Sequence, residues 1–370
     1  MEYVMLKDVC AINMGQSPDS DSYNNNGEGV PFFQGNADFG ERYPVVRKWC
    51  SAPTKMAAPE DILISVRAPI GAMNYAKEEC CIGRGLAALT PDRTKVSPEF
   101  LFWLLKEKNT ELNSKGTGST FKAIGKKVLE ETMIPNIPIE KQLEYSEALE
   151  KVHAIIQMRK KEIQHLDDLI KARFVEMFSS IREERLLGEI SEFVTVGIAN
   201  SATHAYAESG IPMLRNQNIK ENYLDDSDLI YIKPEFAAKY DSKCLKQNDI
   251  IVMRTGYPGV ACLVPEKYEG CQTFTTLIVR LKPNNNPSYV CSYINSDFGK
   301  KFINSEKVGV AQQNVGAKSL AKMPIKIAPK EIQDEFATFV DQVDKSKVVV
   351  QKALDETQIL FNSLMQQYFG

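Results

Sequence analysis

The chain has 370 residues and a formal net charge of −3, with 43% hydrophobic and 25% charged residues. This length allows two or three domains, and the composition is that of a folded chain, which excludes a disordered protein. The longest apolar runs are shorter than the roughly 18–20 residues of a membrane span, and the acidic N-terminal residues 1–8 hold no apolar signal core. A cytoplasmic protein with no membrane partner is therefore expected.

Residues 1–137 are predicted to form a mixed α/β domain. Short β-branched stretches such as residues 62–66 alternate with Gly, Pro and Asn, which predicts strands joined by tight turns. Residues 98–108 begin with a proline that follows a serine, and this pattern is typical of a helix start.

Residues 138–180 are predicted to form one long helix. Residues 140–178 contain no Gly or Pro, and Pro138 precedes them. Apolar residues recur every seven positions, which predicts a coiled-coil seam that is interrupted at Arg159 and Arg173. The seam positions are Leu149, Ile156, Ile163, Ile170 and Met177, with Val152 and Leu166 between them.

The second half of the chain repeats the first half in the same order. Residues 29–33 (GVPFF) recur 181 residues later as residues 210–214 (GIPML). Residues 138–142 (PIEKQ) recur 191 residues later as residues 329–333 (PKEIQ). Chance similarity would not keep this order, so the chain is interpreted as an internal duplication.

The duplication predicts a second mixed domain over residues 181–328 and a second long helix over residues 329–370. Within the second domain, residues 275–281 are expected to form a strand and residues 287–304 a helix. Both long helices could pack on their own domains, or they could pair with each other. The second seam fails at Lys347 and Thr357, away from the positions of the two arginines in the first seam, which favours a pair.

The transition from each mixed domain to its helix carries a recurring set of residues. In the first half these are residues 116–121 (GTGSTF), Ile124, residues 134–135, Pro138 and Gln142. In the second half they are residues 308–315 (VGVAQQNV), Leu320, residues 323–324, Pro329 and Gln333. With the duplication, these residues resemble the DNA-specificity subunit of type I restriction–modification systems over essentially the whole chain. The first half departs from the pattern, because residues 119–122 (STFK) stand where the second half has Gln312–Asn314, and the contacts of that loop stay open.

The resemblance implies an α+β fold, with two duplicated mixed α/β target-recognition domains separated by two long helices that form an antiparallel coiled-coil pair. It also implies a non-catalytic subunit with no cofactor of its own. Each recognition domain would read one half of a bipartite double-stranded DNA site in the major groove, and the helices would set the spacing and dock two methyltransferase subunits. Those subunits would bind S-adenosylmethionine and methylate adenine at N6. Translocase–nuclease (restriction) subunits would then join and use ATP.

A catalytic centre in the chain itself is not expected. Residues 286–289 (NPSY) are close to the Asn-Pro-Pro-aromatic motif of adenine methyltransferases, but their counterpart, residues 97–100 (SPEF), opens the equivalent helix, so helix entry explains both. The sequence contains neither a glycine-rich cofactor loop nor an ATP-binding loop. The eight cysteines form no Cys-x-x-Cys pair, which argues against a metal site and predicts reduced, mostly buried thiols.

DNA-contacting side chains are expected in three loops of each half: after the Gly-Val/Ile-Pro strand, after the Asp-Ile-Leu/Ile strand, and before the transition. Arginine pairs with guanine edges and Asn or Gln with adenine edges, while Lys and Arg hold phosphates. The candidates are Gln34, Asn36, Arg67, Lys122 and Lys126 in the first half and Arg215, Gln217, Asn218, Arg254, Tyr257, Gln312, Gln313 and Asn314 in the second. Each alone could be an ordinary solvated loop group, and recurrence at equivalent places favours DNA contact. The weak net charge predicts that the chain alone binds DNA poorly.

Two other functions stay open from the sequence. The chain could be a scaffold that holds protein partners and binds no nucleic acid, or an enzyme with an unrecognised site. Co-purification with a methyltransferase would separate the specificity subunit from the scaffold. Methyl transfer by the isolated chain would support the enzyme.

Overall fold

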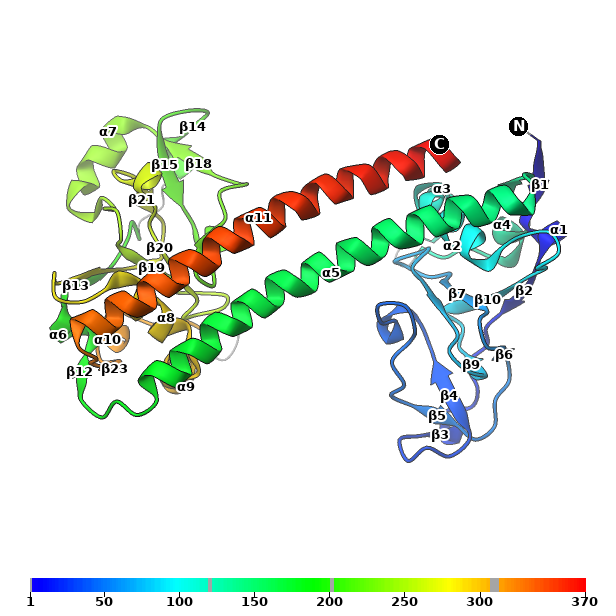
Figure 1. Ribbon diagram of the computed structural model, residues 1–370, viewed down its shortest axis with the longest axis horizontal. Helices are drawn as coiled ribbons and strands as arrows, with labels where there is room; N and C mark the ends of the chain where they lie inside the picture. The colour runs from blue at the N-terminus through cyan, green and yellow to red at the C-terminus, as the bar shows by residue number, and fades with distance from the viewer. Residues whose placement is uncertain (1, 119–121, 200–202, 307–312) are drawn as a thin grey trace. The chain divides into compact units, whose positions relative to one another are not determined.

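The computed structural model describes residues 2–118, 122–199, 203–306 and 313–370. The chain folds as two compact units (Figure 1): unit 1 comprises Met1–Lys160 and Lys352–Gly370, and unit 2 comprises Lys161–Gln351. Each unit therefore contains one copy of the mixed domain and parts of both long helices.

In the described part of unit 1, the strands form a four-stranded sheet, a five-stranded sheet and one strand pair. The antiparallel four-stranded sheet has the order β2 (Cys10–Met14), β10 (Leu86–Pro91), β7 (Ile62–Ser65), β8 (Met73–Tyr75). The five-stranded sheet has the order β3 (Tyr23–Asn24), β5 (Trp49–Cys50), β4 (Val30–Phe33), β9 (Cys80–Ile82), β6 (Met56–Ala57), and only β4 and β9 run parallel. The strand pair consists of β1 (Tyr3–Met5) and β11 (Met133–Pro135).

Strand β7 is buried on both faces, which explains why its sequence is a continuous apolar run. Ile62 and Ile64 pack in one cluster with the helix residue Phe100, while Leu63 packs on the other face with Ile82. The short helices of unit 1 are α1 (Leu6–Val9), α2 (Pro98–Glu107), α3 (Asn109–Ser114), α4 (Lys126–Glu130) and the 3-10 turns η1 (Ser20–Ser22) and η2 (Asn36–Asp38).

Unit 2 repeats the central sheet of unit 1 in the same strand order. Its antiparallel four-stranded sheet has the order β13 (Ser191–Val196), β22 (Leu277–Leu281), β19 (Ile250–Val252), β20 (Ala261–Leu263). A second sheet has the order β14 (Tyr206–Ala207), β18 (Ile230–Ile232), β15 (Ile211–Leu214), β21 (Gln272–Thr273), and its β15–β21 pair is parallel, like β4–β9 in unit 1. The remaining pairs are β12 (Glu184–Leu186) with β23 (Pro324–Lys326) and β16 (Ile219–Lys220) with β17 (Tyr223–Leu224). The shared order confirms the duplication.

One helix predicted for unit 2 is divided into two. Residues 287–304 were expected to form a single helix, but α8 (Pro287–Asn295) ends before Ser296, and α9 (Asp297–Glu306) begins after it. The Ser296 hydroxyl donates to the main-chain oxygen of Tyr293 (2.6 Å) and accepts from the main-chain nitrogen of Gly299 (3.4 Å). Serine competes in this way with the helical hydrogen bonds and starts a new helix. The other helices of unit 2 are α6 (Leu187–Ile190), α7 (Pro234–Ala237), α10 (Ala317–Leu320) and the 3-10 turns η3 (Thr203–Ala205), η4 (Asn216–Asn218), η5 (Ala238–Lys243) and η6 (Glu266–Tyr268).

The two long helices are α5 (Ile139–Phe178) and α11 (Lys330–Phe369), each of 40 residues. In unit 1, the first part of α5 contacts the last part of α11, where the rings of Tyr145 and Tyr368 stack 4.0 Å apart. In unit 2, the last part of α5 contacts the first part of α11, where the ring centroids of Phe174 and Phe336 are 5.5 Å apart. Both contacts have the antiparallel sense, and they confirm the predicted helix pair (Figure 1).

Charged residues fill two of the predicted breaks in the seam, and both contacts lie within unit 2. The guanidinium of Arg173 donates to Glu335 on α11 (3.1 Å), and the ammonium of Lys347 lies 2.8 Å from a carboxylate oxygen of Asp167 on α5. In the first seam, Leu149, Ile156 and Ile170 are buried. The seven-residue repeat of the second helix predicts seam positions at Val340, Val343, Val350, Leu354, Phe361, Leu364 and Tyr368, and the first five of these are buried. The frame is wrong at the end of α5, where Phe174 and Phe178 are buried and Met177 is only partly buried. There α5 packs on both α11 and the domain core, because the Phe178 ring lies 5.4 Å from Phe336 of α11 and 4.4 Å from Tyr289 of α8.

A buried glutamine joins each long helix to its domain. The main-chain nitrogen of Ser97, just before α2, donates to the side-chain oxygen of Gln142 (2.9 Å). The main-chain nitrogen of Asn286, just before α8, makes the same bond to Gln333 (2.9 Å). Each glutamine amide also donates to the main-chain carbonyl five residues earlier in the chain. This joint gives a physical reason for the glutamine in both transition sequences.

All eight cysteines are unpaired, and all except Cys244 are buried, as the sequence predicted. Burial raises the pKa of the Cys10 and Cys80 thiols to about 12, which keeps them protonated and unreactive. In the described ranges, no three His, Cys, Asp or Glu side chains gather as a metal site would require. No helix in the same ranges combines the length and apolarity needed to cross a bilayer.

Candidate nucleic-acid interface

Three of the predicted residues of unit 1 line one open hollow. Gln34 and Asn36 come from the loop after β4, and Arg67 comes from the loop after β7. The hollow is also lined by Lys48 and Arg84, which the sequence did not single out, and by Asp38. The fold therefore brings two distant loops to one concave surface that carries three cationic side chains.

The carboxylate of Asp38 shapes the loop after β4. It accepts hydrogen bonds from the main-chain nitrogens of Gln34 (2.8 Å) and Gly35 (3.4 Å), which closes the turn η2. The side-chain amides of Gln34 and Asn36 make no hydrogen bond to another residue within the described ranges. They remain available to a ligand in the hollow.

Arg84 reaches the hollow through a close approach between two loops. Its neighbour Gly85 donates from the main chain to the oxygen of Gln34 (3.2 Å), and a Cβ atom on Gly85 would lie 2.4 Å from that oxygen. Only glycine fits there. The sequence signal was the Gly-Arg-Gly triplet at residues 83–85, an arginine between two glycines at the end of a short strand. Lys48 has no comparable signal, because its position depends on the pairing of β4 with β5.

The third predicted loop of unit 1 lies against the second by main-chain hydrogen bonds. Ala68 donates to the carbonyl of Lys122 (3.0 Å), and Ala123 forms a β-bridge with Arg67. The backbone of Lys122 therefore lies against that of Ala68, next to Arg67 at the hollow, and the Lys122 side chain is exposed. Lys126 lies farther along, at the start of α4, where its ammonium is 3.5 Å from Glu130.

In unit 2, Asn216 holds the equivalent loops together. Its side-chain amide donates to the hydroxyl of Thr255 (3.0 Å), and its side-chain oxygen accepts from the main-chain nitrogen of Arg254 (3.0 Å). Thr255 forms a β-bridge with Asn314, in the loop before α10. Two predicted residues, Arg254 and Asn314, thus meet at one junction, and Tyr257 beside it is 77% exposed.

Other predicted residues of unit 2 are engaged within their own loop. Arg215 and Gln217 both donate to the carboxylate of Asp228, and the Arg215 contact is 3.0 Å long. Asn218 is buried, and its side-chain oxygen accepts from the main-chain nitrogen of Arg215 (2.9 Å). This is the role that Asp38 has in unit 1, so Asn218 shapes the loop. Gln313 is exposed, and Gln312 lies outside the described residues.

A family model described as the type I restriction modification DNA specificity domain matches residues 1–167 and 182–357. The two matched segments follow the two copies of the repeat.

Two curated proteins with similar sequences carry related names. The putative type I restriction enzyme MjaX specificity subunit of Methanocaldococcus jannaschii is 44% identical over 156 residues, which are 42% of this chain and 37% of that protein. The match thus spans little more than a third of that relative. The type I restriction enzyme EcoBI specificity subunit of Escherichia coli is 18% identical over 98% of this chain and 83% of that protein.

The fold is also similar to a solved structure. The crystal structure of a type I restriction–modification S subunit from M. genitalium matches with a TM-score of 0.60 and 14% identity, over 100% of this chain and 96% of the other. At this identity the match shows a shared fold.

Proposed function

Because the chain belongs to the family of type I restriction modification DNA specificity domains, we propose that it is the specificity subunit of a type I restriction–modification complex. Unit 1 and unit 2 each read one half of a bipartite double-stranded DNA site. The observation that carries this proposal is the meeting of separate loops in each unit, at the hollow of unit 1 and at the Asn216 junction of unit 2.

The side chains at these places fit the edges of bases in a major groove. Arginine binds guanine with two hydrogen bonds, and Asn or Gln does the same with adenine. Unit 1 offers Arg67, Gln34 and Asn36, and unit 2 offers Arg254 with the exposed ring of Tyr257. Lys48 and Lys122 supply charge for phosphates.

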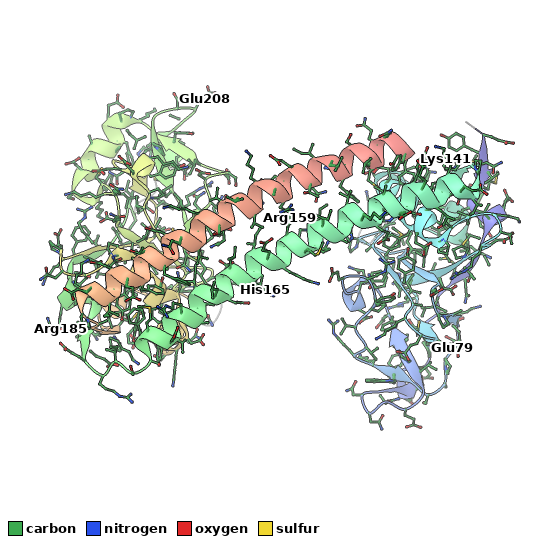
Figure 2. All side chains as sticks on the ribbon, in the orientation of Figure 1. Glu79, Lys141, Arg159, His165, Arg185 and Glu208 are labelled. Carbon is green, nitrogen blue, oxygen red and sulfur yellow. The ribbon has the colours of Figure 1, made fainter. Side chains whose placement is uncertain are left out.

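The long helices carry exposed apolar side chains that support a role in docking. In unit 1, Met158 and Ile359 are 60% and 70% exposed, and in unit 2, Val348 and Val349 are 69% and 68% exposed. Figure 2 labels Arg159, next to Met158 in the chain, and His165 farther along α5. Val348 and Val349 are neighbours in the chain, and adjacent exposed apolar side chains of this kind support a protein contact. Two methyltransferase subunits dock here and methylate adenine at N6 with their own S-adenosylmethionine, and restriction subunits join them. The chain itself catalyses no step.

The test of two independent readers is a domain exchange. The chain is co-expressed with its methyltransferase subunit, and methylated adenines are mapped across a genome. Replacing residues 1–137 with the matching part of another specificity subunit should change one half of the target and leave the other half intact. If both halves changed together, the model of two independent readers would be wrong.

A second test asks whether the helices set the spacing of the two half-sites. Seven residues are inserted after Lys160 in α5 and seven after Gln351 in α11, which preserves the seven-residue seam of both helices. A helix rises about 1.5 Å per residue, so each helix lengthens by about 10 Å. At about 3.4 Å per base pair, the spacer should grow by about three base pairs with unchanged half-sites. An unchanged spacer in an active complex would show that the helices do not measure DNA. An insertion in α5 alone is the control, because it leaves the seam unmatched.

A further inference from the structure

Unit 1 has a turn that is one residue longer than its counterpart in unit 2, and Arg84 lies at the middle of it. Equivalent main-chain hydrogen bonds fix both ends of the turn. In unit 1, Gln16 donates to Ile82 (3.0 Å) and Gly15 donates to Leu86 (2.9 Å). In unit 2, the same two bonds join Ile198 to Thr273 (2.8 Å) and Gly197 to Thr276 (3.0 Å). Between these anchors unit 1 has residues 83–85 (GRG), and unit 2 has only residues 274–275 (FT).

The longer turn holds the backbone of Arg84 firmly. Gly83 donates to the main-chain oxygen of Phe33 (2.8 Å), Gly85 donates to that of Gln34 (3.2 Å), and Leu86 closes the turn by donating to Gly83 (3.0 Å). A Cβ atom on Gly83 would lie in tight contact, 3.0 Å from the Cα of Gln34, and one on Gly85 would clash with the Gln34 oxygen at 2.4 Å. Arg84 therefore starts from a fixed position beside Gln34.

The guanidinium of Arg84 is left without a counter-charge. Its side chain lines the hollow and is exposed, and no carboxylate in the described ranges pairs with it. Two other loop arginines are paired: Arg42 lies 2.8 Å from Glu150, and Arg215 lies 3.0 Å from Asp228. Arg67 shares the hollow with Arg84 and likewise has no ion pair within the described ranges. The charge of Arg84 is thus free for a ligand.

In unit 2, the polar side chain of the shorter turn, Thr275, is hydrogen-bonded within the unit. Thr275 accepts a long hydrogen bond from the side-chain amide of Asn216 (3.5 Å), which also donates to Thr255. The residue of unit 1 equivalent to Asn216 is Asn36, which begins the turn η2 after the parallel strand β4. Asn36 lines the hollow together with Arg84. The two units therefore differ in which side chains they leave open for reading.

We propose that Arg84 is a specificity-determining residue, and that the half-site read by unit 1 contains a guanine whose O6 and N7 it binds. The inference rests on the proposed function of the chain. A planar guanidinium on a fixed backbone suits two parallel hydrogen bonds to a guanine edge. A phosphate contact needs only a nearby positive charge, and it would not require the fixed backbone of the turn at residues 83–85. Unit 2 has no such arginine in its shorter turn, so its half-site does not depend on this contact.

The test maps methylated adenines for the full complex with unaltered chain, with Arg84→Gln and with Arg93→Gln. Arg93 is the matched control, because it is an exposed arginine of unit 1 that follows the far end of β10 and pairs with Glu60 (2.5 Å). Arg84→Gln should relax one guanine position in the half-site of unit 1, with a loss of discrimination from about 5-fold to about 150-fold. The other half-site and the spacer should not change. Arg93→Gln should leave the whole target unchanged.

A filter-binding series at several salt concentrations separates base reading from phosphate binding. A lost phosphate contact lowers the salt slope by about one and weakens all sequences alike. Uniform weakening with an unchanged target, or no effect of Arg84→Gln, would overturn the proposal. So would a unit 1 half-site without any guanine, identified by the exchange of residues 1–137. Failure of the proposed function looks different, because the unaltered complex would then show no bipartite target at all.

Discussion

The two units close the loop before their central strand with the same buried carboxylate but with different partners. In unit 1, Asp61 accepts from the main-chain nitrogen of Ala58 (2.8 Å), and in unit 2, Asp249 accepts from that of Lys246 (2.8 Å). Asp249 also receives two hydrogen bonds from the guanidinium of Arg280, at 2.8 Å and 2.6 Å. The residue opposite Asp61 is Thr90, and burial raises the pKa of the Asp61 carboxyl. The two units thus share the buried carboxylate and differ in its counter-charge.

The helix pair varies in the same way. At equivalent places, unit 1 has Tyr145, whose partly exposed ring stacks on Tyr368, and unit 2 has Phe336, which is fully buried against Phe174 and Phe178. Each unit therefore pairs the same segments of helix with side chains of its own. Both units thus keep the pairing of α5 with α11, but the side chains at equivalent positions differ between them.

The largest expected change in stability comes from truncating the aromatic residues at the two ends of the helix pair. Phe336→Ala should lower the free energy of unfolding by about 3–5 kcal/mol, because it opens a cavity in a closed core. Tyr145→Ala should cost about 1–2 kcal/mol, because that ring is partly exposed and loses mainly a stacking contact. Urea unfolding of the full chain measures both, and hydrogen exchange shows which unit opens. Equal costs would mean that the two ends of the pair are packed alike.

Removing the guanidinium from unit 2 should have the next largest effect. Arg280→Met leaves the carboxylate of Asp249, which is 2% exposed, without its ion pair. Breaking a buried pair on one side should cost about 3 kcal/mol. The matched variant Thr90→Val in unit 1 removes a hydroxyl and no charge, so it should cost about 1 kcal/mol. A smaller loss for Arg280→Met than for Thr90→Val would show that the ion pair contributes no net stability.

Asp61 predicts a pH dependence that belongs to unit 1. Its folded pKa is raised above the unfolded value, so the unfolded chain loses this proton first as the pH rises. The contribution of Asp61 to stability is therefore full at acid pH and decreases as the pH rises through the folded pKa. Asp61→Asn should remove this decrease, so the variant should gain stability relative to the unaltered chain above about pH 4.

A variant of opposite sign provides the control for Asp61. Hydrogen bonds from Thr94, with help from Lys95, lower the pKa of the exposed Asp92 carboxyl. Asp92→Asn should therefore lose stability relative to the unaltered chain at neutral pH, and this loss should disappear as the pH falls. Urea unfolding between pH 3 and pH 7 measures both variants. The same sign for both would contradict the assignment of the Asp61 shift to burial.

The duplication made most of the fold predictable from the sequence. The helices α5 and α11 begin 191 residues apart, as the repeat of PIEKQ and PKEIQ indicated, and Gln142 and Gln333 in those segments make equivalent joints. The break at Ser296 was not predictable from periodicity, because one serine hydroxyl and the close packing of Gly299 decide it. Phe174 and Phe178 were missed because the seven-residue frame ends where α5 meets the domain core.

The candidate site was predictable as loops and not as individual side chains. The sequence predicted Gln34 and Arg67 in two separate loops, and the fold brings these loops to one surface. The repeat did not identify Arg84, because the parallel pairing of β4 with β9 joins segments about 50 residues apart. It also could not foresee that Asp228 would engage Arg215, since that carboxylate lies in a different loop. Nonlocal partners decide which polar groups of a loop remain free.

The smallest expected effect concerns the contact between the loop that follows η2 in unit 1 and the long helix α5. Arg42, in the loop that follows η2, lies 2.8 Å from Glu150 on α5, and both side chains are partly exposed. Such a pair contributes only about 0.2–1 kcal/mol to stability. A double-mutant cycle with Arg42→Gln and Glu150→Gln should give a coupling energy in this range, and the coupling should weaken in high salt because the pair is near solvent. Glu147→Gln, one turn earlier on the exposed side of α5, is the matched control and should show no coupling to Arg42. A coupling above about 2 kcal/mol would be far outside the surface range, and it would contradict the assignment of this contact as a solvent-exposed ion pair.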